Sequence, residues 1–137
     1  MNKEKMTPAQ SEAARRAVGS KRFRWMPGML HEFTDKRGCR YYNRVDEKGR
    51  VWGATCSGLP APSVGCGAGC CLPVVSDAAT RGCLLALVRE AWGDPHTSTR
   101  WVVAKRMWLV DPPARETPEF FGRTEVEALV AALEAAP

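Results

Sequence analysis

The feature that most constrains the fold is a well-delimited amphipathic helix after the middle of the chain. Asp77 is a suitable N-cap for a helix over 78–92, because its carboxylate can accept from the first free N–H groups. Gly93 and Pro95 follow directly, as is typical of a helix end. Helical spacing places one apolar face on this segment, made of Leu84, Leu87, Val88, Ala91 and Trp92.

A second capped helix is predicted at the end of the chain. Thr124 and Glu127 form the pattern of a capping box, and the helix should finish near Ala136. Its apolar face follows the same spacing and consists of Val126, Leu129, Val130 and Leu133. The two helices therefore frame the last sixty residues.

Extended segments lie between these helices. Residues 101–110 form either one kinked strand or two halves around Lys105-Arg106, and Phe120–Phe121 is a short further strand. Two helices with one apolar face each are most economically accommodated on a shared sheet. We therefore expect a layered helix-strand-strand-helix module over 76–137 and an α+β fold class for the chain.

The front of the chain has a different pattern. Over 1–22 we expect a mobile N-terminus with a short helix that Thr7 and Pro8 start and Gly19 ends; its apolar stripe is thin, so the helix is either frayed or packed on a partner. Residues 23–75 are interpreted as a basic β-rich subdomain. Its predicted parts are a strand at 23–25, a turn at 26–29, a hairpin of 39–45 with 50–55, and an irregular Gly/Cys-rich loop at 57–72.

Positive charge is concentrated in that front part. Residues 1–50 contain 13 Lys/Arg and 6 Asp/Glu, which gives +7, whereas residues 51–137 contain 7 and 9, which gives −2. This asymmetry favours an anionic partner for the front half, such as nucleic acid, a nucleotide or an acidic protein surface; a plain solvated surface is the alternative. We find neither an apolar run long enough for a membrane helix nor a secretory h-region, so we expect a cytoplasmic protein without a membrane partner.

Basic and aromatic residues alternate at two places in the front half. Trp25 and Trp52 could stack on a base while neighbouring arginines contact phosphate. The alternative is that the tryptophans are core residues on plain strands. The candidate ligand-binding set is Arg22, Arg24, Trp25, Arg44, Arg50 and Trp52.

The cysteines are the second candidate constellation. A set of four follows C-x9-C-x3-C-C spacing, and thiolates on glycine-rich turns can surround a tetrahedral zinc ion. Paired C-x2-C knuckles are lacking, so we favour idle thiols in a reducing compartment over structural zinc, and expect no cofactor. Cys83 is expected to pack near the core. The candidate metal ligands are Cys56, Cys66, Cys70 and Cys71.

The helical segments also carry a family resemblance. Residues 77–80, 82–95 and 124–133, together with the turn Trp25-Met26-Pro27-Gly28-Met29, resemble small phage and prophage proteins with a bacteriophage ABA sandwich domain. The resemblance covers about 72–137 and departs at the Gly/Cys-rich stretch 57–71. It implies an α/β sandwich and a phage-encoded origin, in the cytoplasm of a host bacterium. It brings no known activity and no catalytic residue.

No catalytic constellation appears in the sequence. His31 and His96 have no nucleophile or carboxylate at a known catalytic spacing, and His96 is expected on a surface loop. We therefore predict a non-enzymatic phage accessory protein that binds a host protein or a small anionic, host-made ligand, as in counter-defence by sequestration. A nucleic-acid-binding module that uses the basic front half is the alternative. A thiol enzyme is the minor third hypothesis, and the oligomeric state stays open.

Overall fold

The computed structural model describes residues 5–34, 40–49, 71–111 and 119–137. In these ranges it contains three helices and two three-stranded antiparallel sheets, and the predicted α+β class is confirmed. The elements in chain order are α1 Pro8–Gly19, β1 Leu30–Thr34, β2 Arg40–Arg44, β3 Cys71–Pro73, α2 Ala78–Trp92, β4 Ser98–Val102, β5 Met107–Asp111, β6 Phe120–Gly122 and α3 Glu125–Ala135.

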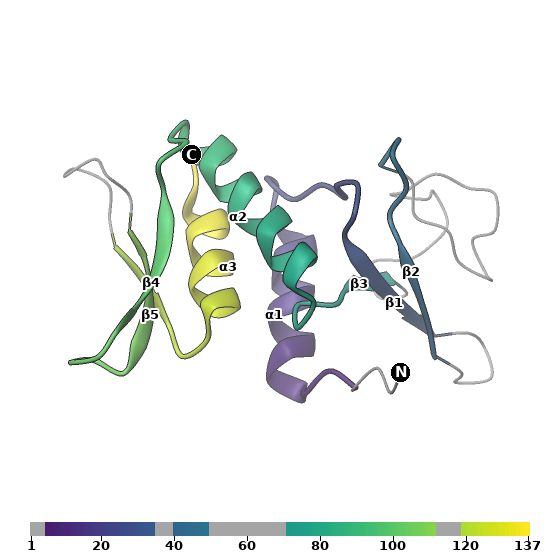
Figure 1. Ribbon diagram of the computed structural model, residues 1–137, viewed down its shortest axis with the longest axis horizontal. Helices are drawn as coiled ribbons and strands as arrows, with labels where there is room; N and C mark the ends of the chain where they lie inside the picture. The colour runs from purple at the N-terminus through teal and green to yellow at the C-terminus, as the bar shows by residue number, and fades with distance from the viewer. Residues whose placement is uncertain (1–4, 35–39, 50–70, 112–118) are drawn as a thin grey trace.

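The three helices form a layer between the two sheets (Figure 1). They run in the same general direction, so that all three begin at one end of this layer and finish at the other. α3 lies at the centre of the packing, because it contacts α1, α2 and the strands of the second sheet. Within the described ranges, no helix is both long and apolar enough to cross a membrane.

The short N-terminal helix is an integral part of this layer. Thr7 and Gln10 form a complete capping box, Pro8 occupies the first turn and the helix ends at Gly19, as predicted. Its alanine stripe is almost fully buried, with Ala14 and Ala17 at 0% exposure, because small side chains let α1 approach α3 and β3 closely. Within the described chain α1 is therefore packed on its own protein, contrary to the frayed or partner-bound helix that its thin stripe predicted.

The first sheet has the strand order β2-β1-β3. Its central strand, β1, was not predicted, and β3 falls partly in the segment expected to be irregular. The strand predicted at 23–25 is wrong: Phe23 and Trp25 lie in non-regular backbone, and their alternation reflects an edge-to-face ring pair 5.2 Å apart. The predicted turn is confirmed, with Pro27 before Gly28 at a φ of 89°.

β2 belongs to the segment predicted as the first half of a hairpin. The turn after it is confirmed, since the Gly49 N–H donates to the Asp46 carbonyl at 2.9 Å and Gly49 has a φ of 74°. β2 pairs with β1 in the described structure. The predicted second half, 50–55, lies outside the described residues.

The second sheet has the order β4-β5-β6. For residues 101–110 the alternative of two strands, rather than one kinked strand, is correct. β4 and β5 form a hairpin, and Arg106 in its turn has a φ of 49°. β6 then crosses close beneath α3. A Cβ on Gly122 would lie 2.4 Å from the Ala128 nitrogen, so this approach requires glycine.

The two predicted long helices are confirmed at their termini. Asp77 caps α2 and Gly93 ends it with a φ of 65°, while Thr124 caps α3 by accepting from the Glu127 N–H. The arrangement of α2 and α3 differs from the prediction, in which both helices cover one shared sheet. α3 covers the second sheet, and α2 packs mainly on α3 and reaches that sheet through the Trp92–Phe120 ring contact. The reason is that α3 is buried on several sides, so its apolar residues contact both α2 and the second sheet.

Candidate functional site

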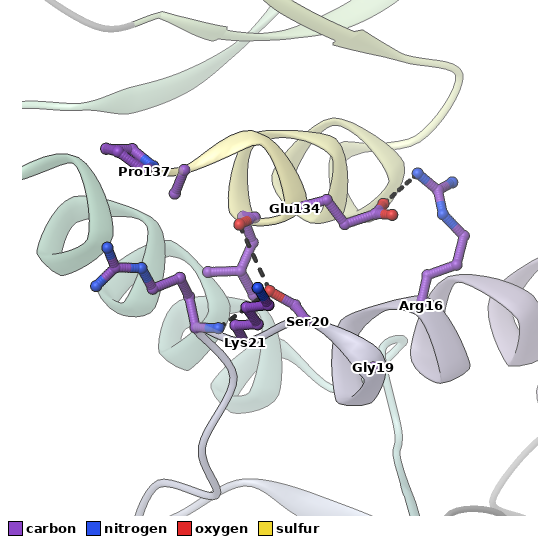
Figure 2. A pocket seen from close by; sticks show the side chains of 9 residues that line it. Arg16, Gly19, Ser20, Lys21, Glu134 and Pro137 are labelled. Atoms are coloured by element: carbon purple, nitrogen blue, oxygen red, sulfur yellow. Dashed lines mark hydrogen bonds and ion pairs between the residues drawn. The ribbon is translucent and has the colours of Figure 1, made fainter.

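A groove opens at the end of the helical layer where α1 and α3 finish. Its volume is about 760 Å³, within the range of about 300–1,000 Å³ that is typical of small-ligand sites. Its lining, which we call the basic groove, consists of Arg16, Gly19, Ser20, Lys21, Arg22, Leu133, Glu134, Ala136 and Pro137. Figure 2 shows this groove between the end of α3 and the segment that follows α1.

Local structure explains why cations lie at this groove. α1 stops at Gly19, and the Ser20 hydroxyl donates to the Leu133 carbonyl at 3.5 Å while accepting from the Arg22 N–H at 3.2 Å (Figure 2). These contacts tie the chain that leaves α1 to the end of α3. Lys21 and Arg22 are thereby held at the groove as exposed residues.

The charges of the groove are only partly compensated. Arg16 forms an ion pair with Glu134 across the α1–α3 contact (Figure 2). Lys21 and Arg22 form no ion pair with any residue in the described ranges. The side chains of the groove thus sum to +2, with Lys21 and Arg22 outside any ion pair, although Arg22 lies near enough to Glu90 to help Arg24 lower the pKa of that carboxyl.

The helix ends oppose this charge but do not cancel it. Each helix C-terminus carries roughly −0.5 elementary charge, so two helices contribute about −1. Part of the positive charge is therefore explained as a complement to the helix dipoles. The side-chain charge of the lining therefore exceeds the opposing charge of the two helix ends by about +1.

The structure divides the described arginines of the predicted ligand-binding set: Arg24 and Arg22 both lower the pKa of Glu90, whereas Arg44 lies at the other end of α2. Arg24 contacts Glu90 at 2.6 Å near the end of α2, and this bond lowers the pKa of the Glu90 carboxyl. Arg44 contacts both oxygens of Asp77 at the start of α2, at 2.9 and 3.0 Å. Their acidic partners are separated by about 20 Å along the helix axis, so one small ligand cannot contact both arginines. Of the predicted set, Arg22 lines the basic groove.

Trp25 belongs to a continuous row of rings. It meets Phe23 at 5.2 Å and His31 at 5.9 Å, and the row continues through Phe33 to Tyr41. His31 and Phe33 are buried, so the row acts as packing on the first sheet and positions Trp25 as a half-buried ring. The alternative of a core tryptophan describes this position better than a base-stacking platform.

Several candidate residues fall outside the described ranges. These are Arg50 and Trp52 of the ligand set, and Cys56, Cys66 and Cys70 of the metal set. The remaining metal candidate, Cys71, begins β3. Among the described residues, no group of three or more His, Cys, Asp or Glu side chains is close enough to hold a metal ion.

The other titratable candidates have structural environments. Cys83 packs against the core, as expected, and burial raises the pKa of its thiol, which disfavours the thiolate that a nucleophile requires. His96 is exposed on the loop after α2, also as expected, and its backbone N–H donates to the Asp94 carboxylate at 2.9 Å.

A second hollow, of about 540 Å³, lies at the opposite end of the helical layer. It is bordered by the starts of all three helices, and its floor includes Ala13, Val75 and Val126. Its cation, Arg81, contacts Glu125 at 3.7 Å and donates to the Ser76 carbonyl at 2.7 Å. With Glu127 also in the lining, the side chains sum to −1, which the three helix N-termini offset with about +1.5, but the cation of this hollow is already paired, unlike Lys21 and Arg22 at the basic groove.

Sequence reasoning missed Arg16, Lys21 and Glu134. The adjacent pair Lys21-Arg22 directly after a predicted helix stop was a usable signal, because a chain leaving a helix end is exposed. The approach of Glu134 to Arg16 joins residues 118 apart in sequence and has no local signal.

Comparisons with known protein families, with curated protein sequences and with solved structures find no match for this chain. The resemblance to phage ABA sandwich proteins therefore stays a prediction.

Proposed function

We propose that this chain is a non-enzymatic binding protein that holds a small, phosphate-bearing ligand in the basic groove. The observation that supports this most directly is the presence of two exposed cations, Lys21 and Arg22, that form no ion pair in the described ranges, at the edge of a ligand-sized groove. Phosphate groups prefer such sites because ammonium and guanidinium groups donate several charge-assisted hydrogen bonds.

The sequence resemblance adds a biological context to this proposal. If the chain is a phage accessory protein, its ligand is a host-made anion such as a nucleotide, and binding alone would remove that ligand from the host. Sequestration of this kind requires no catalytic residue and takes place in the host cytoplasm. Sequestration does require a charged groove that binds the ligand at the concentration present in the host.

Two measurements test the proposal. Native mass spectrometry of freshly purified protein should show a mass increment from a co-purified small anion. Calorimetric titration at about 20 mM salt should show that inorganic pyrophosphate binds with one-to-one stoichiometry, with weaker binding at about 150 mM salt.

The nucleic-acid alternative is separated by one further titration. A single-stranded oligonucleotide of about twelve residues should bind no more tightly than pyrophosphate if the groove accepts small ligands. Tighter binding of the oligonucleotide, with a steep salt dependence, would support the nucleic-acid module and contradict the small-ligand proposal.

A further inference from the structure

We propose that Glu134 is an internal competitor that sets the anion affinity of the basic groove. This inference builds on the proposed function and concerns the same site. The Glu134 carboxylate contacts the Arg16 guanidinium, the third cation of the groove, as Figure 2 shows. An incoming phosphate can use Arg16 only by displacing this carboxylate.

The position of Glu134 is unusual for the helix that carries it. Glu134 lies in the last turn of α3, where the helix dipole disfavours an acidic side chain. α3 has no basic residue in that turn to compensate it. The contact with Arg16 from α1 supplies the compensation, so Arg16 and Glu134 stabilise each other while no ligand is present.

The exposure of the pair makes displacement feasible. The side chains of Arg16 and Glu134 are 42% and 41% exposed, so water can solvate the released carboxylate. An exposed ion pair contributes little to stability, and a ligand with two or more negative charges can outcompete a single carboxylate. Glu134 therefore discriminates against singly charged anions and favours phosphate-bearing ones.

The test is a double-mutant cycle with inorganic pyrophosphate as the probe. Wild type, Glu134→Gln, Arg16→Gln and the double variant are titrated at about 20 mM salt, with the melting temperature of each as a folding control. Glu12→Gln is the matched control, because Glu12 forms an ion pair with Arg15 on α1 but does not line the groove.

We expect Glu134→Gln to tighten pyrophosphate binding by about threefold to fivefold, the range expected for one exposed ion pair. The gain should disappear when Arg16→Gln is also present, and Glu12→Gln should have no comparable effect. An equal gain with and without Arg16 would indicate a general charge effect and overturn direct competition. An unchanged or weaker affinity of Glu134→Gln would overturn the inference while leaving the proposed function intact.

Failure of the proposed function would give a different result in the same titrations. If neither wild type nor Glu134→Gln binds pyrophosphate, the groove is not an anion site and both ideas are overturned. If Glu134→Gln binds and wild type does not, the competition is stronger than proposed and the inference is supported.

Discussion

The two ends of the helical layer use their charged side chains differently. Where the helices begin, Asp77 accepts hydrogen bonds from Arg44 and from both donors of Thr80, and the Thr80 hydroxyl in turn accepts from the Leu30 N–H at 2.9 Å. This network joins the start of α2 to β1 through Leu30 and to β2 through Arg44. Where the helices finish, Lys21 and Arg22 form no ion pair in the described ranges, although Arg22 lies near enough to Glu90 to help Arg24 lower the pKa of that carboxyl.

Exposure explains the different consequences of similar ion pairs. The side chain of Asp77 is 16% exposed, whereas that of Glu90, which pairs with Arg24 near the other end of α2, is 61% exposed. Water screens the second pair far more than the first. The less exposed pair of Arg44 and Asp77 at the starting end therefore maintains the fold, whereas at the finishing end the pairs are exposed and Lys21 and Arg22 form none in the described ranges.

The largest effect is expected at the end of β6, where it approaches α3, for Gly122→Ala. The added methyl group would lie 2.4 Å from the Ala128 nitrogen and 2.8 Å from the Glu127 Cβ, so α3 must move away from β6. Overpacking of this kind should lower the free energy of unfolding by about 3 kcal/mol, as measured by urea denaturation.

Gly82→Ala is the matched control for that variant. Gly82 is inside α2, and an added Cβ would meet nothing within 4 Å. This substitution should raise the free energy of unfolding by about 0.5–1 kcal/mol, because alanine favours the helix. Equal effects of the two substitutions would contradict the close approach of β6 to α3.

A smaller loss is expected for Asp77→Ala. The substitution removes the N-cap of α2 and leaves Arg44 without its carboxylate, which should lower the free energy of unfolding by about 2 kcal/mol. Glu90→Gln removes the exposed partner of Arg24 and should leave the urea midpoint nearly unchanged. A similar loss in both variants would remove the distinction between the two ends.

The pH dependence of stability sharpens the same comparison. The hydrogen bonds from Arg44, with those from Thr80, lower the pKa of Asp77 from 3.8 to about 2. The contribution of Asp77 is therefore complete above about pH 5 and is lost as pH falls through 4 towards 2, because the unfolded chain takes up the proton first.

Urea denaturation of wild type and Asp77→Asn across this range gives the measurement. The difference in free energy of unfolding should shrink by about 2 kcal/mol between pH 5 and pH 2. A difference that stays constant over this range would show that the Asp77 carboxylate is not stabilised in the folded protein.

The elements that the sequence predicted correctly are those with local determinants. The ends of α2 and α3 follow from Asp77, Gly93 and Thr124, because caps act within a few residues. β3 was missed because its pairing with β1 joins segments about forty residues apart. β1 was missed, although it also pairs with the nearby β2, because it has no apolar alternation of its own. The predicted strand at Phe23 failed because alternation alone does not distinguish sheet pairing from a ring contact.

The candidate site was predictable only in part. Arg22 could be identified from its basic surroundings, but the division of the arginines into structural and available ones depends on long-range contacts. Arg44 meets a carboxylate 33 residues away and Arg24 one 66 residues away. No local pattern shows such partners, so the predicted set combined two arginines that lie at opposite ends of α2.

We propose that the finishing end of the helical layer binds anions through Lys21 and Arg22. The most direct test compares pyrophosphate binding by Lys21→Gln/Arg22→Gln with binding by Lys48→Gln/Arg100→Gln, whose side chains are exposed and lie outside the groove. Both double variants lose the same charge. We expect the first to weaken binding by at least about tenfold and the second by less than about twofold. Equal weakening in both would contradict a specific site at the basic groove.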